Sequence, residues 1–425
     1  MDLERILSEQ RAELESVDLN SLCSRREEAE VNLDSKLAQI IIGVRRSGKS
    51  TLCQKVLLQS NVKFAYVNFD DERLARIEQS QLDEVLETLY RLFGDFTHLF
   101  LDEVQNVDGW PLFVNRLLRQ GMKLVLTGSN ANLLSGELAT HLTGRYHQIE
   151  LYPFSFSEYC QALGIDIQRN TAKAAGLRLQ ALDKYLFEGG FPELLNVDAP
   201  TDYVRSLITA IVTKDISRRY NIRYKQTLAD MANGMLDKFC QEISVADLTR
   251  DFQIKSEHTT RNYINYLETA YLVCNVPKYS FKSRERQLFR KYYAVDTAFI
   301  SRHESLQTEN LGWRLENVVA VELLRRINRE YEQLYYLRKN KDFEVDFVVV
   351  SQSKVKELVQ VTYDYSDPSV KLRNRETGGL VKGAKMTGCN QLTLVMMKGE
   401  KGTETIEGYT IHKTPATDWL LKRKE

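Results

Sequence analysis

Residues 43–50 read GVRRSGKS and fit the pattern G-x-x-x-x-G-K-[ST]. The apolar run AQIIIGV leads into them, and TLCQKVLLQ continues with a helical pattern, so the motif joins a predicted strand to a predicted helix. In this context the glycines let backbone N–H groups curl around a phosphate, and the helix amino terminus favours the anion. The pattern predicts a sheet with a phosphate-binding loop. The alternative, a chance glycine-rich turn, is disfavoured by the flanking strand and helix.

The loop predicts ATP and Mg²⁺ as cofactors. Lys49 is expected to reach the β- and γ-phosphate oxygens, and Ser50 is expected to ligate Mg²⁺. The predicted nucleotide-binding residues are Gly43, Arg45, Arg46, Ser47, Gly48, Lys49, Ser50 and Thr51.

A second apolar run, LFLDE, delivers two carboxylates where the predicted strand ends. Ligands bind open parallel sheets at the carboxyl ends of their strands, so both carboxylates are expected near the loop. Asp102 is expected to hold Mg²⁺, and Glu103 is expected to polarise the water that attacks the γ-phosphate. The alternative is a solvated Asp-Glu turn, which the loop disfavours. The pair therefore predicts hydrolysis as well as binding.

Two further positions are candidates with open alternatives. Ser129, Asn130 or Thr127 can hydrogen-bond the γ-phosphate or the lytic water, or Ser129 and Asn130 can simply cap a following helix. Arg145 is expected at the ligand end of the sheet, where it can stabilise transition-state charge within its own subunit or in a neighbour, or form a structural ion pair. Arg218 and Arg219 compete for this role.

The runs IIGVRRSGKSTL, NFDDERL, LFLDEVQNVDGW, LTGSNANLL and LTGRYHQIELYPFSFSEY resemble the archaeal-type AAA ATPases. The resemblance extends over nearly the whole chain, through YLFEGGFPELL, LENVVAVELLRR and EVDFVV. It implies an ASCE-type P-loop fold in which Lys49, Ser50, Asp102 and Glu103 have the roles argued above. Members of this family combine the ATPase with a C-terminal domain similar to restriction endonucleases.

Composition narrows the class of protein. The 58 basic and 58 acidic residues give zero net charge, which argues against a generally basic nucleic-acid binder but leaves room for local patches. The six cysteines form no CxxC pair, as expected of reduced thiols. The charged amino terminus is not a signal peptide, and no apolar run is long enough to span a membrane. We expect a cytoplasmic protein without membrane contact.

The pattern of apolar and polar residues, and with it the predicted secondary structure, changes several times along the chain. The predicted organisation is an N-terminal helical segment over 1–36, a P-loop ATPase domain over 37–153, a helical lid over 154–235, a winged helix over 236–291 and a restriction-endonuclease-like domain over 292–425. Strands alternate with helices in the second region, which predicts a parallel sheet. The fold class is therefore α/β.

The winged helix has two interpretations. The predicted wing, residues 277–291, carries Lys278, Lys282, Arg284, Arg286, Arg290 and Lys291 against Glu285 alone. These side chains suit phosphate contacts, and the second helix offers Glu257, His258, Arg261 and Asn262 to a major groove. The alternative is a scaffold packed between the other domains. DNA is thus a candidate partner, and so is a second copy of the chain.

The C-terminal region resembles the PD-(D/E)xK nuclease arrangement. Glu316 and Asp346 stand where acidic groups hold Mg²⁺, but Gln360 replaces the second acid and Thr362 replaces the lysine. These departures predict a degenerate site formed by Glu316, Asp346 and Gln360, and nuclease activity is not expected.

Three functions compete. The leading hypothesis is Mg²⁺-dependent ATP hydrolysis that drives or gates rearrangement of DNA-associated winged-helix and nuclease-like modules. The alternatives are an ATP-gated nuclease effector and an ATP-dependent protein assembly switch without nucleic-acid contact.

Overall fold

The computed structural model describes residues 2–129, 142, 144–280, 282–302, 310–339 and 342–422. The chain separates into two compact units, which are described in turn. Unit 1 comprises Met1–Pro153 with Thr269–Tyr271, and unit 2 comprises Phe154–Glu268 and Leu272–Glu425. The finer division of the chain into five parts stays a prediction.

Unit 1 contains a parallel five-stranded sheet, as expected from the alternating pattern and consistent with a P-loop NTPase. The strand order is β2-β3-β4-β1-β5, and every neighbouring pair is parallel. The strands are β1 (Ala38–Ile42), β2 (Phe64–Asn68), β3 (His98–Asp102), β4 (Lys123–Gly128) and β5 (Tyr146–Glu150). The carboxyl ends of β1, β3 and β4 therefore meet at one edge of the sheet.

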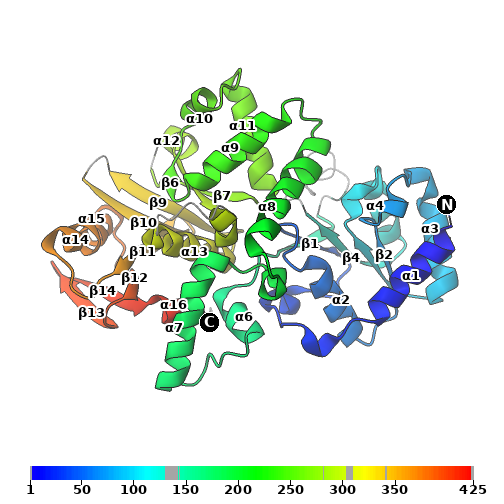
Figure 1. Cartoon of the computed structure of the whole chain (residues 1–425), viewed down its shortest axis with the longest axis horizontal. Coiled ribbons are helices and arrows are strands. Elements are labelled where there is room, and N and C mark those ends of the chain that lie inside the picture. The colour runs from blue at the N-terminus through cyan, green and yellow to red at the C-terminus, as the bar shows by residue number, and fades with distance from the viewer. Residues whose placement is uncertain are drawn as a thin grey trace. The chain divides into compact units, whose positions relative to one another are not determined.

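Four helices in the described part of unit 1 surround this sheet. They are α1 (Leu3–Glu15), α2 (Lys49–Gln59), α3 (Leu82–Phe93) and α4 (Trp110–Arg119). Leu14 of α1 and Leu52 of α2 share a core cluster with Phe100 of β3. Figure 1 shows α2 and α4 on opposite sides of the strands. The sheet is thus covered on both faces.

The leading segment is less helical than its pattern predicts. Helix α1 ends at Glu15, and only 3₁₀ turns follow, at Leu19–Ser21 and Arg26–Glu30. The Asp18 side chain accepts a hydrogen bond from the backbone N–H of Asn20. Such local side-chain bonds compete with helix formation, which explains the early end of α1.

Unit 2 begins with a helical region. It contains α6 (Phe156–Ala162), α7 (Ala172–Glu188), α8 (Pro200–Ala210), the π-helix η8 (Ile211–Arg218) and α9 (Lys225–Asp237), with a 3₁₀ turn at Pro192–Asn196. A Cβ at Gly190 would lie 2.2 Å from the Phe154 carbonyl oxygen, so only glycine fits there. This close approach lets the start of unit 2 pack against the turn after α7.

A small three-stranded sheet follows, with the order β6-β8-β7. Its strands are β6 (Gln241–Glu242), β7 (Val273–Pro277) and β8 (Arg290–Ala294), and the helices α10 (Val245–Asp251), α11 (Glu257–Thr269) and α12 (Ser283–Leu288) lie between them in sequence. Helix α11, the second helix of the predicted winged helix, buries Thr260, Tyr263, Ile264 and Leu267. The Ser256 hydroxyl accepts a hydrogen bond from the Thr259 N–H, as expected of a cap.

The C-terminal part of unit 2 has a six-stranded mixed sheet of order β13-β14-β12-β11-β10-β9. The strands are β9 (Glu332–Lys339), β10 (Phe343–Ser351), β11 (Lys354–Asp364), β12 (Leu392–Lys398), β13 (Gly402–Ile406) and β14 (Tyr409–Pro415). The helices are α13 (Leu311–Arg326), α14 (Val370–Arg375), α15 (Thr377–Thr387) and α16 (Ala416–Leu421), with a 3₁₀ turn, η9, at Thr297–Arg302. Leu380 and Ala384 of α15 pack on Leu358 and Val345 of the sheet. No helix among the described residues is long and apolar enough to cross a membrane.

Candidate active site

The loop between β1 and α2 adopts the backbone that its glycines predict. Gly48 is the amino-terminal cap of α2 and has a φ of 93°, in the left-handed region. A Cβ at Gly43 would lie 2.0 Å from the Leu151 carbonyl oxygen, so no larger residue fits there. Ser47 is buried, and its hydroxyl has no hydrogen-bond partner. Arg45 is half-buried, whereas Arg46 and Thr51 are exposed.

The two predicted carboxylates meet the loop. The Ser50 hydroxyl donates to Asp102 Oδ1 over 2.8 Å, and Lys49 Nζ lies 3.7 Å from Glu103 Oε1. Lys49 Nζ also donates to the Val44 carbonyl at 3.1 Å. These contacts join the end of β3 to the start of α2, because both lie at the same edge of the parallel sheet.

Thr127, near the end of β4, joins the Asp102 carboxylate to the backbone of Glu103. Its hydroxyl accepts a 2.9 Å hydrogen bond from the Glu103 N–H and donates to Asp102 Oδ1. Ser129 lies two residues further and is 1% exposed, and its hydroxyl is one of the groups that lower the pKa of Glu103. Asn130 lies outside the described residues. Of the three candidates, Thr127 is the one that hydrogen-bonds to both Asp102 and the backbone of Glu103.

Burial and neighbouring charges shift the pKa values of the two carboxylates in opposite directions. Burial raises the pKa of Asp102 to about 6, the negative charge of Glu103 adds to the rise, and the hydrogen bonds from Thr127 and Ser50 oppose it. Burial alone would also raise the pKa of Glu103, but the Lys49 ammonium, together with Gln105, Arg45 and Ser129, outweighs burial and holds this pKa below its ordinary value. At neutral pH Glu103 is therefore ionised, whereas Asp102 loses its proton only as the pH rises through about 6.

Glu103 also has an unusual backbone. Its φ and ψ are 48° and 44°, in the left-handed region, where a glutamate is strained. The Thr127 hydrogen bond to its N–H holds this conformation. Strain of this kind concentrates at functional sites, because the surrounding structure must maintain it.

Arg25 was not singled out from the sequence, yet it braces the loop. Its guanidinium is buried and donates to the Ser47 carbonyl at 2.9 Å and to the Tyr152 carbonyl at 2.6 Å. Lys55 of α2 in turn lies 2.9 Å from Glu28. The segment after α1 therefore holds the loop from behind. Arg25 is one of four arginines in the leading segment, and nothing in the sequence marks it as a partner of the loop.

Arg145 is not where it was expected. It immediately precedes β5, whose first residue pairs with Ala38, the first residue of β1. The loop leaves the other end of β1, which is five residues long, so Arg145 lies about 15 Å of strand away. Its side chain donates to Asn115 Oδ1 at 2.8 Å. The expectation of a guanidinium at the ligand end of the sheet is therefore wrong, because the turn lies before the strand instead of after it. Arg218 and Arg219, the competing candidates, are exposed at the end of η8 in unit 2.

The three residues of the predicted degenerate site come together in unit 2. The Asp346 N–H donates to Gln360 Oε1 at 3.2 Å, Gln360 Nε2 donates to Glu376 Oε2 at 2.7 Å, and Glu316, Asp346 and Gln360 line one cavity of 550 Å³. Burial and the nearby Glu316 charge raise the pKa of Asp346 well above its usual range. Glu376, which also lines this cavity, completes the group.

The position of Lys291 differs from the one predicted for it in the wing. We expected it among the phosphate-contacting side chains, but it is only 5% exposed and points into the same cavity, 3.1 Å from Glu316 Oε1. Burial alone would lower its pKa, but the surrounding carboxylates raise it well above the usual range. Lys282 keeps an exposed position, whereas Lys278 and Arg286 are partly buried. The reason is that Lys291 belongs to β8, in which all four residues from Lys291 to Ala294 are buried.

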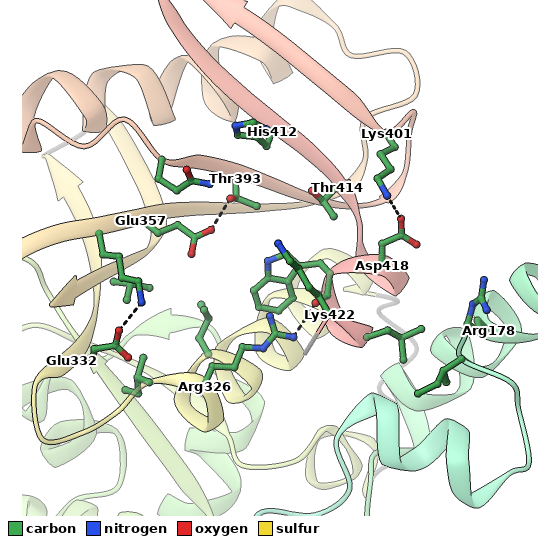
Figure 2. Close-up of a pocket in the computed structure, with 18 of the residues that line it drawn as sticks. Arg178, Arg326, Glu332, Glu357, Thr393, Lys401, His412, Thr414, Asp418 and Lys422 are labelled. Atoms are coloured by element: carbon green, nitrogen blue, oxygen red, sulfur yellow. Dashed lines mark hydrogen bonds and ion pairs between the residues drawn. The ribbon is translucent and has the colours of Figure 1, made fainter. Parts of the chain in front are cut away.

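A larger cavity of 910 Å³ lies elsewhere in unit 2, and Figure 2 shows its lining. Its charged groups are largely paired, for example Lys356 with Glu332 at 2.7 Å and Lys401 with Asp418 at 2.7 Å. None of the residues singled out from the sequence lines it. Its pairing leaves no group of free carboxylates, so it is a different kind of site from the loop edge in unit 1.

Comparison with known families defines the class of protein. Residues 35–160 match the model of an AAA domain, AAA_14, and residues 179–310 match a domain of unknown function, DUF8612. The first match covers the parallel sheet, the loop and both carboxylates. This part of unit 1 is thus similar to an AAA domain, and its parallel five-stranded sheet is consistent with a P-loop NTPase.

Individual relatives define the family. The chain is 32% identical to an uncharacterized protein of Methanocaldococcus jannaschii over 408 residues, covering 92% of this chain and 90% of the relative. It is 31% identical to an uncharacterized protein of Haemophilus influenzae over 308 residues, covering 69% of this chain and 76% of that one. The chain belongs to the same family as these two proteins. Among solved structures, it is similar to a Walker-type ATPase of Pyrococcus abyssi, with 14% identity, a TM-score of 0.44, and coverage of 66% of this chain and 95% of that chain.

Proposed function

We propose that the chain binds ATP with Mg²⁺ and hydrolyses it at the edge of the sheet in unit 1. The observation that carries this proposal is the 2.8 Å contact between Ser50 of the loop and Asp102 at the end of β3. It joins the phosphate-binding loop to the carboxylates, which is the arrangement that nucleotide hydrolysis needs.

The residues present fit a magnesium ion. The Ser50 hydroxyl and the Asp102 carboxylate are hard oxygen ligands that already touch each other. The buried Ser47 hydroxyl, which has no hydrogen-bond partner among the described residues, leaves a further polar atom in the loop. When bound, Mg²⁺ would neutralise charge on the phosphate oxygens, held by Ser50 and Asp102.

The other residues of the site have distinct roles in this proposal. The Lys49 ammonium binds the β- and γ-phosphate oxygens and releases its contact with Glu103 as it does so. Glu103, ionised at neutral pH, then accepts a proton from the attacking water as general base. The left-handed backbone of Glu103 and the Thr127 hydrogen bond fix the direction of its carboxylate. Ser129 orients the γ-phosphate or the water.

Two substitutions test the site. Lys49→Ala should abolish ATP binding and hydrolysis, with Lys49→Arg as the matched control for charge. Glu103→Gln keeps the shape of the side chain, so it should still bind ATP while turnover falls by ~10²-fold or more. Nucleotide binding by calorimetry and phosphate release measure the two steps separately. Retained hydrolysis in Lys49→Ala would remove the basis of the proposal.

A second candidate function is contact with nucleic acid through a winged helix built from α10, α11 and the small sheet. The favouring observation is an aromatic stack of Tyr220 on Tyr266 of α11, with ring centroids 3.9 Å apart. It holds the basic segment 214–225 beside α11. The exposed basic residues of that segment are Lys214, Arg218, Arg219, Arg223 and Lys225. Together they form a confined positive surface suited to phosphate contacts.

In this proposal the nucleotide state rearranges the winged helix and a nuclease-like C-terminal domain on DNA. A titration of short duplex DNA across salt, with and without ATP, tests it. Arg219→Ala should reduce the salt dependence by about one phosphate contact, whereas Arg169→Ala, at an exposed arginine elsewhere in unit 2, should leave it unchanged. Absence of salt-dependent binding favours instead a switch that assembles protein partners, with Arg145 available to a neighbouring subunit.

A further inference from the structure

Lys291 occupies the centre of a carboxylate cluster in unit 2. Its Nζ lies 2.5 Å from Glu344 Oε1, 3.1 Å from Glu316 Oε1 and 3.8 Å from Asp346 Oδ1. Lys291 belongs to β8 of the small sheet, whereas the carboxylates belong to α13 and β10 of the C-terminal part. One ammonium therefore joins two substructures of unit 2 inside the 550 Å³ cavity.

The residues of this cluster do not fit the metal ion that the nuclease-like arrangement implies. Magnesium needs free oxygens at about 2.0–2.1 Å in a near-octahedral set. Here Asp346 Oδ2 accepts from the Val361 N–H at 2.9 Å, and Glu316 Oε1 accepts from the Tyr293 hydroxyl at 2.9 Å. Within the described residues, no group of three or more His, Cys, Asp or Glu side chains could hold a metal ion.

The remaining acid of the group is also engaged. Glu376 receives the Gln360 amide at 2.7 Å and forms an ion pair with the Arg375 guanidinium. Glu344 is shared between Lys291 and Arg338, which lies 3.6 Å away. Each carboxylate of the cluster thus has a protein partner.

We propose that Lys291 is a built-in cation that takes the place of the divalent metal, so that the C-terminal domain holds its carboxylates together without cleaving nucleic acid. The ammonium bridges Glu316, Glu344 and Asp346 as a metal ion would, but it offers no vacant position for water or phosphate. It also pins β8 to the six-stranded sheet. The nuclease-like arrangement is then a structural junction.

Manganese titration of the nucleotide-free full chain tests the inference. Wild type and Asp346→Asn should bind the same amount of Mn²⁺, because no Mn²⁺ is held by Asp346 in wild type. Lys291→Met removes the ammonium, keeps an unbranched side chain and leaves the carboxylates uncompensated, so it should gain one Mn²⁺ per chain. That gain should disappear in Lys291→Met/Asp346→Asn, whereas Lys291→Arg should not show it. Calorimetry and Mn²⁺ electron paramagnetic resonance measure the stoichiometry.

Other outcomes overturn the inference. Asp346-dependent Mn²⁺ binding by wild type, or Mg²⁺- or Mn²⁺-dependent DNA cleavage that Asp346→Asn abolishes, would make Lys291 a nuclease residue. A folded Lys291→Met that gains no Mn²⁺ would also contradict it. Where Lys291→Met does not fold, the comparison of wild type with Asp346→Asn decides. Because no nucleotide is present, these outcomes are independent of ATP hydrolysis in unit 1.

Discussion

Replacing Thr127 with valine should shift the pH dependence of ATP hydrolysis. Valine keeps the shape of threonine in a fully buried position but removes the hydroxyl that donates to Asp102 and accepts from the Glu103 N–H. The Asp102 pKa is already raised to about 6 by burial, and the Thr127 bond is one of the contacts that restrain it. Removing that bond must raise this pKa further.

The size of the shift follows from the bond that is lost. A hydrogen bond to a charged group is worth about 1.5–3 kcal/mol. Since one pKa unit corresponds to about 1.4 kcal/mol, the pKa of Asp102 should rise by about 1–2 units. Protonated Asp102 is a poor magnesium ligand, so activity on the acid side should fall away at a correspondingly higher pH. The unsatisfied Glu103 N–H should in addition cost about 1–3 kcal/mol of stability.

The assay is kcat/KM for ATP as a function of pH, because this ratio reports the ionisation of the free enzyme. Thr127→Ser is the matched control, since it keeps the hydroxyl and should keep the acid limb of wild type. Thermal melts of both variants check that unit 1 remains folded. If Thr127→Val and Thr127→Ser share one acid limb, Thr127 does not control Asp102 and the electrostatic argument fails.

Three further substitutions separate roles within unit 1. Because the pKa of Asp102 is raised to about 6, its ionisation above that pH lowers the free energy of unfolding by about 3 kcal/mol. Asp102→Asn should therefore abolish hydrolysis yet raise Tm at pH 8. A gain in Tm that persists unchanged below the ordinary pKa of an aspartate would contradict this reasoning. Arg25→Ala removes two hydrogen bonds, to the backbone carbonyls of Ser47 and Tyr152, so ATP affinity measured by calorimetry should fall about tenfold. Arg25→Lys should have an intermediate effect. An unchanged Kd would mean that Arg25 does not hold the loop in place. Arg145→Ala should leave single-turnover hydrolysis by an isolated chain unchanged within about twofold. A larger loss would mean that Arg145 contributes to hydrolysis in its own chain.

The loop edge was predictable because its determinants are local. Strand, glycine loop and helix are consecutive in sequence, and LFLDE carries its own strand signal. Parallel strands bring such ends together without further information, which is why Ser50 and Asp102 could be paired in advance. Thr127 remained one of three candidates, because sequence does not tell which hydroxyl at a strand end turns toward the carboxylates.

Arg145 and Arg25 show where local reasoning ends. The pattern around Arg145 reads equally well as a turn after one strand or before the next, and only the pairing of Ala38 with Tyr146 decides. Arg25 acts through backbone carbonyls, which every residue possesses, so no sequence motif marks its targets. Charge composition likewise misassigned Lys291, because a count of basic residues does not say which of them turn inward.

Lys291 also allows a thermodynamic test of its pairing with Glu316, since both side chains are buried. Removing one partner of a buried ion pair leaves an uncompensated charge and typically costs about 3–5 kcal/mol, whereas replacing both can cost far less. Lys291→Met should therefore lower the free energy of unfolding more than Lys291→Met/Glu316→Gln does. Lys282→Met, at a lysine whose side chain is 80% exposed, is the control and should change it by less than about 0.5 kcal/mol.

Urea unfolding followed by circular dichroism measures the four free energies of this double-mutant cycle. A coupling energy near zero would mean that Lys291 and Glu316 contribute independently, and Lys291 would then not hold the carboxylates together as proposed. A coupling of about 1–3 kcal/mol is expected instead, because the two groups are in contact and share one cavity. Such coupling would explain why the carboxylates are kept in the core of unit 2. With Lys291 buried among them, removing one carboxylate would lower the free energy of unfolding, because part of the lysine charge would lose its partner.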